Sequence, residues 1–220
     1  ICYIEFCKST VGQNLRLNGM KIVVDCAHGS TYHIAPSVFT ELGASVISQG
    51  VSPDGLNINR DAGSTSPQVL ADRVLKEGAD LGVAFDGDGD RVVMVDHLGN
   101  VLDGDAILYI IARDRLRQDI EFGGVVGTQM SNLGLQLGLA ALNVPFTRTP
   151  VGDRYVMQEM IQRGWSLGGE SSGHVICLDL SSTGDGIISA LQALAAVVHG
   201  GKPLAELRAQ MNKLPQKMIN

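Results

Sequence analysis

Short apolar runs alternate with longer amphipathic segments along the first part of the chain. The runs at residues 21–26, 45–50 and 79–85 are rich in valine, isoleucine and leucine, which is typical of buried strands. Between them, residues 33–43 and 66–78 space their apolar side chains at helical intervals and end on a glycine, as helices often do. Strands and helices that alternate at these lengths predict βαβ units, and therefore a largely parallel sheet covered on both faces.

The helix expected at residues 66–78 carries its own start signal. Ser66 is a candidate N-cap and Pro67 occupies the first helical position, which proline tolerates well. We expect one apolar face on this helix, formed by Val69, Leu70, Val74 and Leu75.

The pattern changes after this helix. Residues 91–104 form two extended runs around Leu98-Gly99-Asn100, which predicts a hairpin and hence an antiparallel edge on a mixed sheet. A helix is expected over residues 105–118, and its basic last turn suits a helix C-terminus.

The same rhythm restarts near residue 119. The second half predicts strands at 123–130, 144–150, 165–170 and 174–179 and helices at 131–143, 152–164 and 183–200, with Ser131 as a candidate N-cap. We therefore expect two three-layer α/β domains with mixed, mostly parallel sheets, spanning residues 1–118 and 119–220. No low-complexity linker separates them, so the domains should pack directly and bind ligands at strand ends near the seam.

Composition narrows the possible partners and compartments. The net charge is −6 without a basic cluster, which argues against nucleic acid as a partner. The most apolar segment, residues 186–200, is shorter than a membrane span and contains Ser189 and Gln192, so it predicts a buried helix. Four cysteines without a CxxC pair favour reduced thiols and a cytoplasmic protein. The chain does not begin with methionine, so we expect a fragment of a longer protein.

Three aspartates crowd the segment FDGDGDR at residues 85–91, where Asp86, Asp88 and Asp90 alternate with glycines. The glycines can enter positive φ without a Cβ clash and so let the loop curl its carboxylates inward. Two like charges ~4 Å apart repel by roughly 4 kcal/mol at an effective dielectric near 20, so a cation must offset them. Oxygen-only ligands favour Mg²⁺ or Ca²⁺ over zinc.

The segment does not fit other acidic or phosphate-binding motifs. An EF-hand needs glycine at its sixth position and glutamate at its twelfth, where this chain has Arg91 and His97. No GxGxxG or P-loop motif is present either. An octahedral Mg²⁺ held by three carboxylates keeps open positions for a phosphate oxygen, which indicates phosphoryl chemistry, and Arg91 could bind such an oxygen. The alternative is a solvated acidic turn.

Two later segments could contact a sugar phosphate. In LGGESSGH at residues 167–174, Glu170 and Ser172 could bind sugar hydroxyls, although an ordinary turn with a structural His174 explains the segment equally well. In TPVGDRYV at residues 149–156, Arg154 could reach a phosphate or sugar oxygen. The alternative there is that Asp153 caps the helix and Arg154 is solvated.

Several segments of this chain resemble motifs of the α-D-phosphohexomutase family. Three of them follow one another in the family's order: FDGDGDR, TPVGDRYV and GGESSGH. Two more segments, DCAHGSTYHIAP and STGDGI, are also similar to the family. Family members have four domains, and this sequence is similar to the second and third. The resemblance implies that Mg²⁺ is held by Asp86, Asp88, Asp90 and a phosphoserine oxygen, and that Arg91 is a catalytic residue beside the transferred phosphoryl group. Glu170 and Ser172 would hold the sugar in two orientations. His174 and Arg154 match positions near the substrate.

The chain also departs from the family pattern. Neither an SASHNP-type nucleophile segment nor an RxSGTEP-type phosphate loop is present. The resemblance implies an isomerase that interconverts glucosamine 6-phosphate and glucosamine 1-phosphate through a bisphosphorylated intermediate, in peptidoglycan precursor synthesis. Without the domains on either side, the fragment should be inactive alone. Alternatives are a phosphomannomutase or phosphoglucomutase, or a non-catalytic module that binds Mg²⁺ and sugar phosphate. A phosphatase with an aspartate nucleophile is disfavoured.

Overall fold

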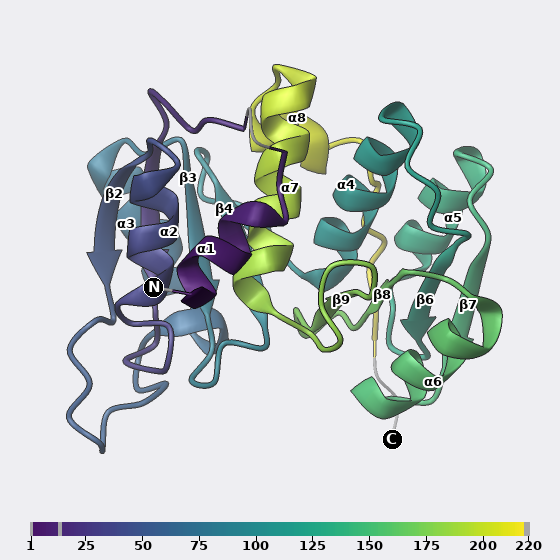
Figure 1. The fold of residues 1–220 in the computed structure, drawn as a ribbon, viewed down its shortest axis with the longest axis horizontal. Helices are drawn as coiled ribbons and strands as arrows, with labels where there is room; N and C mark the ends of the chain where they lie inside the picture. The colour runs from purple at the N-terminus through teal and green to yellow at the C-terminus, as the bar shows by residue number, and fades with distance from the viewer. Residues whose placement is uncertain (1, 13–14, 218–220) are drawn as a thin grey trace.

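Two mixed β-sheets, each flanked by helices, lie side by side in the computed structural model of this chain, which describes residues 2–12 and 15–217 (Figure 1). This arrangement confirms the predicted fold class of two α/β sheets with mostly parallel strands. The strands of the first sheet are β1 (Lys21–Asp25), β2 (Ser45–Gln49), β3 (Leu81–Phe85), β4 (Val92–Asp96) and β5 (Val101–Leu102). Its helices are α2 (Ile34–Glu41) and α3 (Pro67–Glu77), and α4 (Gly104–Arg117) leads out of it.

The second sheet repeats the topology of the first. Its strands are β6 (Val125–Thr128), β7 (Phe146–Thr149), β8 (Leu167–Gly169) and β9 (Val175–Cys177), with helices α5 (Leu133–Ala141), α6 (Asp153–Arg163) and α7 (Gly186–Gly200). The strand order β2-β1-β3-β4 of the first sheet recurs as β7-β6-β8-β9. In both, the first three strands are parallel and the fourth is antiparallel to its neighbour.

Three short helices were not predicted. They are α1 (Cys2–Ser9), the 3₁₀ turn η1 (Gly63–Thr65) and α8 (Leu204–Arg208). Each spans eight residues or fewer.

The start and the buried face of α3 differ from the prediction. Ser66 occupies the N-cap position, but its side chain makes no capping hydrogen bond. Val69 and Leu75 are 43% and 54% exposed, so the buried stripe consists of Leu70, Ala71 and Val74. This stripe packs against Val23, Ala84 and Val95 of the sheet, and the two outer apolar residues of the predicted face stay at the surface.

The N-cap of α5 also differs by one residue. Asn132 caps this helix, because its side-chain oxygen accepts a hydrogen bond from the Gly134 N–H at 2.9 Å. The predicted cap, Ser131, instead accepts a hydrogen bond from the Thr128 N–H at 3.1 Å. The helix begins one residue later than the apolar pattern suggested.

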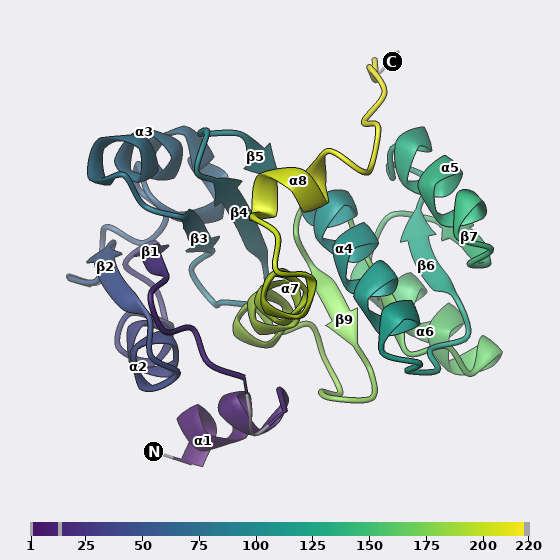
Figure 2. The same cartoon turned by 90° about the horizontal axis from the view of Figure 1, so that it is seen from above.

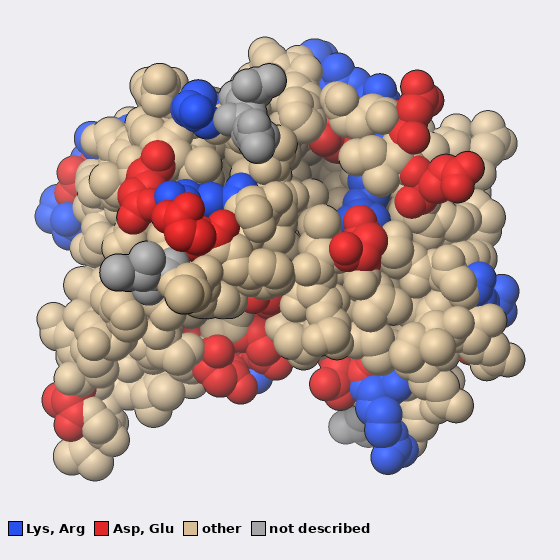
Figure 3. Space-filling model, in the orientation of Figure 1, with Lys and Arg blue, Asp and Glu red and all other residues tan. Residues whose placement is uncertain are grey.

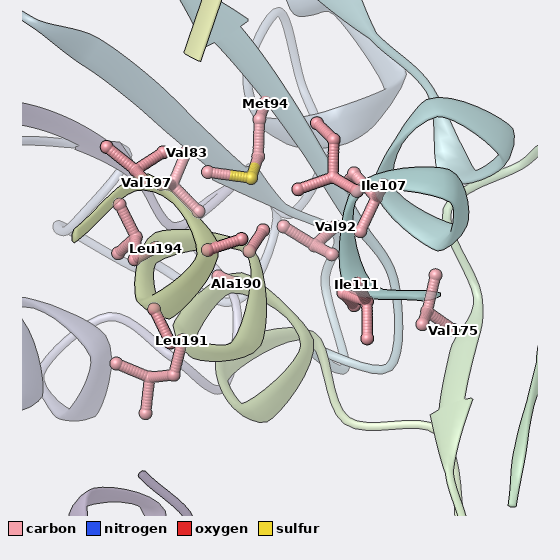
Figure 4. Close-up of a cluster of buried hydrophobic side chains, with 14 of the residues drawn as sticks. Val83, Val92, Met94, Ile107, Ile111, Val175, Ala190, Leu191, Leu194 and Val197 are labelled. Carbon is pink, nitrogen blue, oxygen red and sulfur yellow. The ribbon is translucent and has the colours of Figure 1, made fainter. Parts of the chain in front are cut away.

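Helix α7 joins the two halves through one continuous core. With α4 it lies between the two sheets, in contact with β3, β4 and β9 (Figure 2). Figure 4 shows Val83, Val92 and Met94 of the first sheet packed around α7. The prediction of a buried helix at residues 186–200 is therefore confirmed. The domain division at residue 118 stays a prediction, and apolar packing is continuous across it.

Two further features concern the whole described chain. Within residues 2–12 and 15–217, no helix combines the length and apolar character that crossing a bilayer requires. The four cysteines, all of which lie in the described ranges, form no disulfide with one another.

A buried carboxylate in α4 makes stability depend on pH. Asp105 is 1% exposed; its Oδ2 accepts a hydrogen bond from the Asn132 N–H at 2.6 Å, while Oδ1 has no partner among the described residues. Burial raises the pKa of Asp105 from 3.8 to about 6. The pKa of Asp105 is therefore higher in the folded chain than in the unfolded chain. The protonated carboxyl group contributes to stability at low pH, and this contribution is lost as pH rises through about 6.

Replacing Asp105 with Asn should therefore raise the free energy of unfolding above pH 7 by about 3 kcal/mol. Near pH 4 the variant and the wild type should be nearly equal. Urea unfolding at pH 4, 6 and 8 measures the difference, and the comparison isolates Asp105 from other titrating groups. A loss of stability that is the same at all three pH values would contradict this prediction.

Candidate metal and ligand site

The acidic loop, residues 86–91, joins β3 to β4 at the carboxyl end of β3. Of its two glycines, only Gly89 has a positive φ, 79°. Gly87 lies close to its neighbours instead: a Cβ there would lie 2.6 Å from the exposed Ile58 side chain and 2.8 Å from that of Asn59. The prediction that both glycines supply positive-φ freedom therefore holds for Gly89 and not for Gly87.

The loop brings its three carboxylates together. One oxygen each from Asp86, Asp88 and Asp90 lies within 4.8 Å of the others. Their exposure is graded, because Asp86 is 2% exposed, Asp90 is intermediate and Asp88 is exposed. The cluster is thus open to ligands on one side and closed by the protein on the other.

Arg91 offsets part of the negative charge from within the loop. Its backbone N–H donates to Asp86 Oδ1 at 3.1 Å, and its Nε lies 2.8 Å from Asp86 Oδ2 and 3.5 Å from Asp90 Oδ1. Its side chain is still 43% exposed. Three carboxylates and one guanidinium leave a formal charge of −2 in the loop when all are ionised, which a divalent cation would match.

The two inner carboxyl groups have different proton affinities. Burial raises the pKa of Asp86 to about 6, and the neighbouring Asp90 adds to this effect while the Arg91 N–H opposes it. Burial also acts on Asp90, but hydrogen bonding with Asp86 and the charges of His174 and Arg91 outweigh it and lower the pKa of Asp90. The site therefore stabilises one negative charge well and a second one poorly unless a cation is added.

A loop from the second half reaches this cluster. Residues 170–174 join β8 to β9, the same topological position that the acidic loop occupies in the first sheet. The His174 Nδ1 atom lies 3.1 Å from Asp90 Oδ2, and the Val92 N–H donates to the Gly173 carbonyl at 3.0 Å. His174 is 5% exposed, so it buttresses Asp90. The sequence contained no signal for this pairing.

A polar pocket lies between the two loops. It has a volume of about 300 Å³ and is lined by Asp90, Arg91, Asp153, Glu170, Ser172 and His174. In Figure 3 the lower edge of the molecule is hollowed between its halves, and acidic side chains gather there. The arrowheads of β2 and β6 in Figure 1 point to this same edge, so both sheets present their carboxyl ends to the pocket.

Glu170 and Ser172 face this pocket with different freedom. Glu170 Oε1 accepts a hydrogen bond from the Gly152 N–H at 3.0 Å, which orients the carboxylate at the pocket wall. Ser172 is exposed. Between them they offer an oriented acceptor and a hydroxyl that can donate or accept, which suits the recognition of ligand hydroxyl groups.

Arg154 lies outside the pocket lining, and Asp153 lines it instead. The Arg154 guanidinium stacks 4.9 Å above the Tyr155 ring and is exposed. The alternative prediction that Asp153 caps this helix is wrong. Gly152 occupies the N-cap of α6, and the Asp153 side chain accepts a hydrogen bond from the Arg154 N–H at 2.7 Å. Sequence reasoning did not single out Asp153 as a pocket residue.

The acidic cluster fits a hard divalent cation. Its donors are all carboxylate oxygens, the ligand type of Mg²⁺ and Ca²⁺, and burial raises the pKa of Asp86, an effect that a bound cation would oppose. Asp86, Asp88 and Asp90 are the residues that could hold the ion.

Both halves of the chain match described protein families. Residues 2–99 match "Phosphoglucomutase/phosphomannomutase, alpha/beta/alpha domain II" and residues 103–214 match domain III of the same description. Curated relatives include phosphoglucosamine mutases from Aeromonas hydrophila and Legionella pneumophila, which are 63% and 56% identical over 99% of this chain. The chain spans about half their length, 49% and 48% respectively.

Solved structures share the fold at lower identity. A putative phosphomannomutase from Thermus thermophilus aligns with 96% of this chain and 49% of its own, with a TM-score of 0.83 and 24% identity. An Aspergillus fumigatus N-acetylphosphoglucosamine mutase, solved in complex with GlcNAc-6P and magnesium, covers 97% of this chain and 50% of its own, with a TM-score of 0.77 and 20% identity.

Proposed function

Because this chain belongs to the phosphoglucomutase/phosphomannomutase family, we propose that it is the metal-binding and sugar-binding half of a phosphosugar mutase. One observation carries the proposal: the acidic loop of the first half and residues 170–174 of the second line one polar pocket. A metal site next to a hydroxyl-binding wall suits a phosphorylated sugar. The family resemblance inferred from the motifs is confirmed by these matches.

The proposed substrates are glucosamine 6-phosphate and glucosamine 1-phosphate. Their support is the 56–63% identity to phosphoglucosamine mutases over nearly the whole chain. A phosphomannomutase or phosphoglucomutase is the alternative within the family. In this proposal the phosphoserine nucleophile and a second phosphate-binding loop belong to parts of the protein outside these 220 residues. A cytoplasmic role in peptidoglycan precursor synthesis, and a division into domains at residue 118, are parts of the same proposal.

The acidic loop and His174 have proposed tasks. Asp86, Asp88 and Asp90 would hold Mg²⁺, which when bound neutralises charge on a phosphate ester and so favours transfer of its phosphoryl group. Arg91 adds a positive charge beside the cluster, where charge develops during transfer. His174 holds Asp90 in orientation through the 3.1 Å contact.

The opposite wall has to accept the sugar in two orientations. Glu170, already oriented by the Gly152 N–H, would accept hydrogen bonds from sugar hydroxyls, and Ser172 would donate or accept according to the pose. Arg154, which stacks on Tyr155, could reach the substrate only by leaving that ring, so its role in binding stays a prediction.

The decisive test is an assay of the full-length protein that contains this chain. We expect Mg²⁺-dependent conversion of glucosamine 6-phosphate to glucosamine 1-phosphate, at a higher kcat/KM than with mannose 6-phosphate or glucose 6-phosphate. A preference for either of the other sugars would replace the proposed substrate. Binding of sugar phosphate and Mg²⁺ without turnover in the full-length protein would favour the non-catalytic module.

Replacing Glu170 with Gln in the full-length protein should lower kcat/KM by about 10- to 100-fold, because hydrogen bonds to a charged acceptor contribute about 1.5–3 kcal/mol. The glutamine keeps an oxygen for the Gly152 N–H, so the fold should be retained. Glu159→Gln, on the far end of α6 where Glu159 pairs with Arg163, is the matched control. Equal kinetics for Glu170→Gln and Glu159→Gln would remove Glu170 from the substrate site.

A further inference from the structure

We propose that two loops, one from each half, clamp the backbone of the acidic loop and position its carboxylates for the metal. They are residues 26–31, which follow β1, and residues 183–186, which lead into α7 and include its first residue, Gly186. Neither supplies a residue that lines the pocket. The part of this inference that concerns the metal rests on the proposed function.

The first clamp acts on Gly87. The Ser30 N–H donates to the Gly87 carbonyl at 2.8 Å. Gly29 lies so close that a Cβ built on it would be 2.2 Å from the Gly87 oxygen and 2.6 Å from the Gly87 Cα. Any side chain at residue 29 must therefore displace the acidic loop or the clamp itself.

The first clamp is itself rigidly held. Ala27 and His28 both adopt left-handed conformations, with φ of 53° and 51°, which non-glycine residues rarely do. The fully buried Asp25 supports them, because its Oδ1 accepts from the Ala27 N–H at 2.9 Å while Oδ2 accepts from Gln49 Nε2 at 2.7 Å. Strained backbone held by a buried carboxylate indicates that the position of this loop is tightly determined.

The second clamp acts on Gly89. The Gly186 N–H, at the first residue of α7, donates to the Gly89 carbonyl at 2.9 Å. Asp185 fixes the start of this helix, since its Oδ1 accepts from the N–H groups of Ile187 and Ile188 at 3.0 Å each. The hydroxyl of Tyr3 in α1 donates to the other oxygen of Asp185.

Residues 183–186 also support His174, which contacts the acidic cluster. A Cβ on Gly184 would lie 2.4 Å from the His174 ring, so the loop backbone packs directly against the imidazole. His174 in turn contacts Asp90. The second clamp thus reaches the acidic loop both through the Gly89 carbonyl and through His174.

The two contacts alternate with the three carboxylates along the chain. Asp86, Asp88 and Asp90 are separated by Gly87 and Gly89, and each of these glycines has its carbonyl bonded to a different loop. The peptide groups between the carboxylates therefore cannot rotate freely, which resists the opening that their mutual repulsion favours. Preorganised ligands bind a cation without the added cost of ordering the loop.

Calorimetric Mg²⁺ titration of the 220-residue chain tests the clamps with Gly29→Ala and Gly186→Ala. In Gly186→Ala the new Cβ would lie 2.8 Å from the Arg91 carbonyl and the Phe85 ring. Gly134→Ala in α5 is the matched control, because its Cβ would meet the Asn212 carbonyl at 2.2 Å, away from the pocket. We expect Mg²⁺ affinity to fall at least tenfold in both clamp variants and to be unchanged in the control, although thermal unfolding is shifted in all three.

Unchanged Mg²⁺ affinity in correctly folded clamp variants would overturn this inference and leave the proposed function standing. If Gly186→Ala does not fold, Asp185→Ala takes its place, with Asn132→Ala as a control that removes the N-cap of α5.

Hydrogen exchange separates the clamps from the metal assignment. In the Mg²⁺-free wild-type chain, the amides of Ser30 and Gly186 should exchange slowly, and Gly29→Ala should accelerate exchange at Ser30 more than Gly134→Ala does. If the wild type binds no Mg²⁺, the metal part of the proposed function fails, and slow exchange at both amides still supports the clamps. Fast exchange at both amides in the folded wild type would overturn them.

Discussion

Replacing Asp88 with Asn is expected to weaken Mg²⁺ binding by about 100-fold and to leave the fold of the metal-free chain intact. Asp88 is the exposed member of the acidic cluster, so its carboxylate contributes charge to the site without supporting the loop. A unit charge ~4 Å from another is worth roughly 4 kcal/mol at an effective dielectric near 20, and desolvation offsets part of that, which leaves about 3 kcal/mol, or 100-fold in affinity.

Calorimetric titration of the 220-residue chain with Mg²⁺ measures this effect directly. Asp72→Asn on α3 is the matched control, since Asp72 is also exposed and hydrogen-bonds only to Gln68 among the described residues. In the full-length protein, turnover by Asp88→Asn should fall at low Mg²⁺ and recover in part at high Mg²⁺. Wild-type affinity in Asp88→Asn would show that the cluster does not hold the ion.

The second large effect concerns stability: Leu194→Ala should lower the free energy of unfolding by about 3 kcal/mol, within the range for buried leucines. Leu194 is fully buried on α7, and Figure 4 shows it near Val83 and Val197 in the core around this helix. For a chain of this size the melting temperature should fall by about 6 to 12 °C. Leu137→Ala on α5, where the side chain is 55% exposed, should change it little.

Because one core connects both sheets, Leu194→Ala should destabilise both halves together. Trp165 is the only tryptophan and precedes β8, so its fluorescence reports on the second half, whereas far-ultraviolet circular dichroism reports on the whole chain. The two probes should give coincident transitions in the wild type and the variant. Two separated transitions would mean that the halves unfold independently in spite of the shared helix.

Local rules of sequence predicted most of the secondary structure and failed where packing chose between equivalent positions. The strands and the long helices appear at the expected places, because their apolar periods extend over enough residues to be read. In α3, however, Val69 and Leu75 match the helical period as well as Leu70 does and are nevertheless exposed. Which side of an apolar stripe is buried depends on the neighbouring sheet.

The candidate site also combines features that the sequence predicts with features that depend on tertiary packing. The sequence by itself determined that three carboxylates would meet in a glycine-containing loop at a strand end, because residues so close in the chain cannot separate far. Only the tertiary structure decided that His174 would contact Asp90, 84 residues away, that Asp153 rather than Arg154 would line the pocket, and that α7 would cover the first sheet. These contacts arise from the packing of two sheets against shared helices, which minimises exposed apolar surface over the whole chain and is not encoded in any short segment of it.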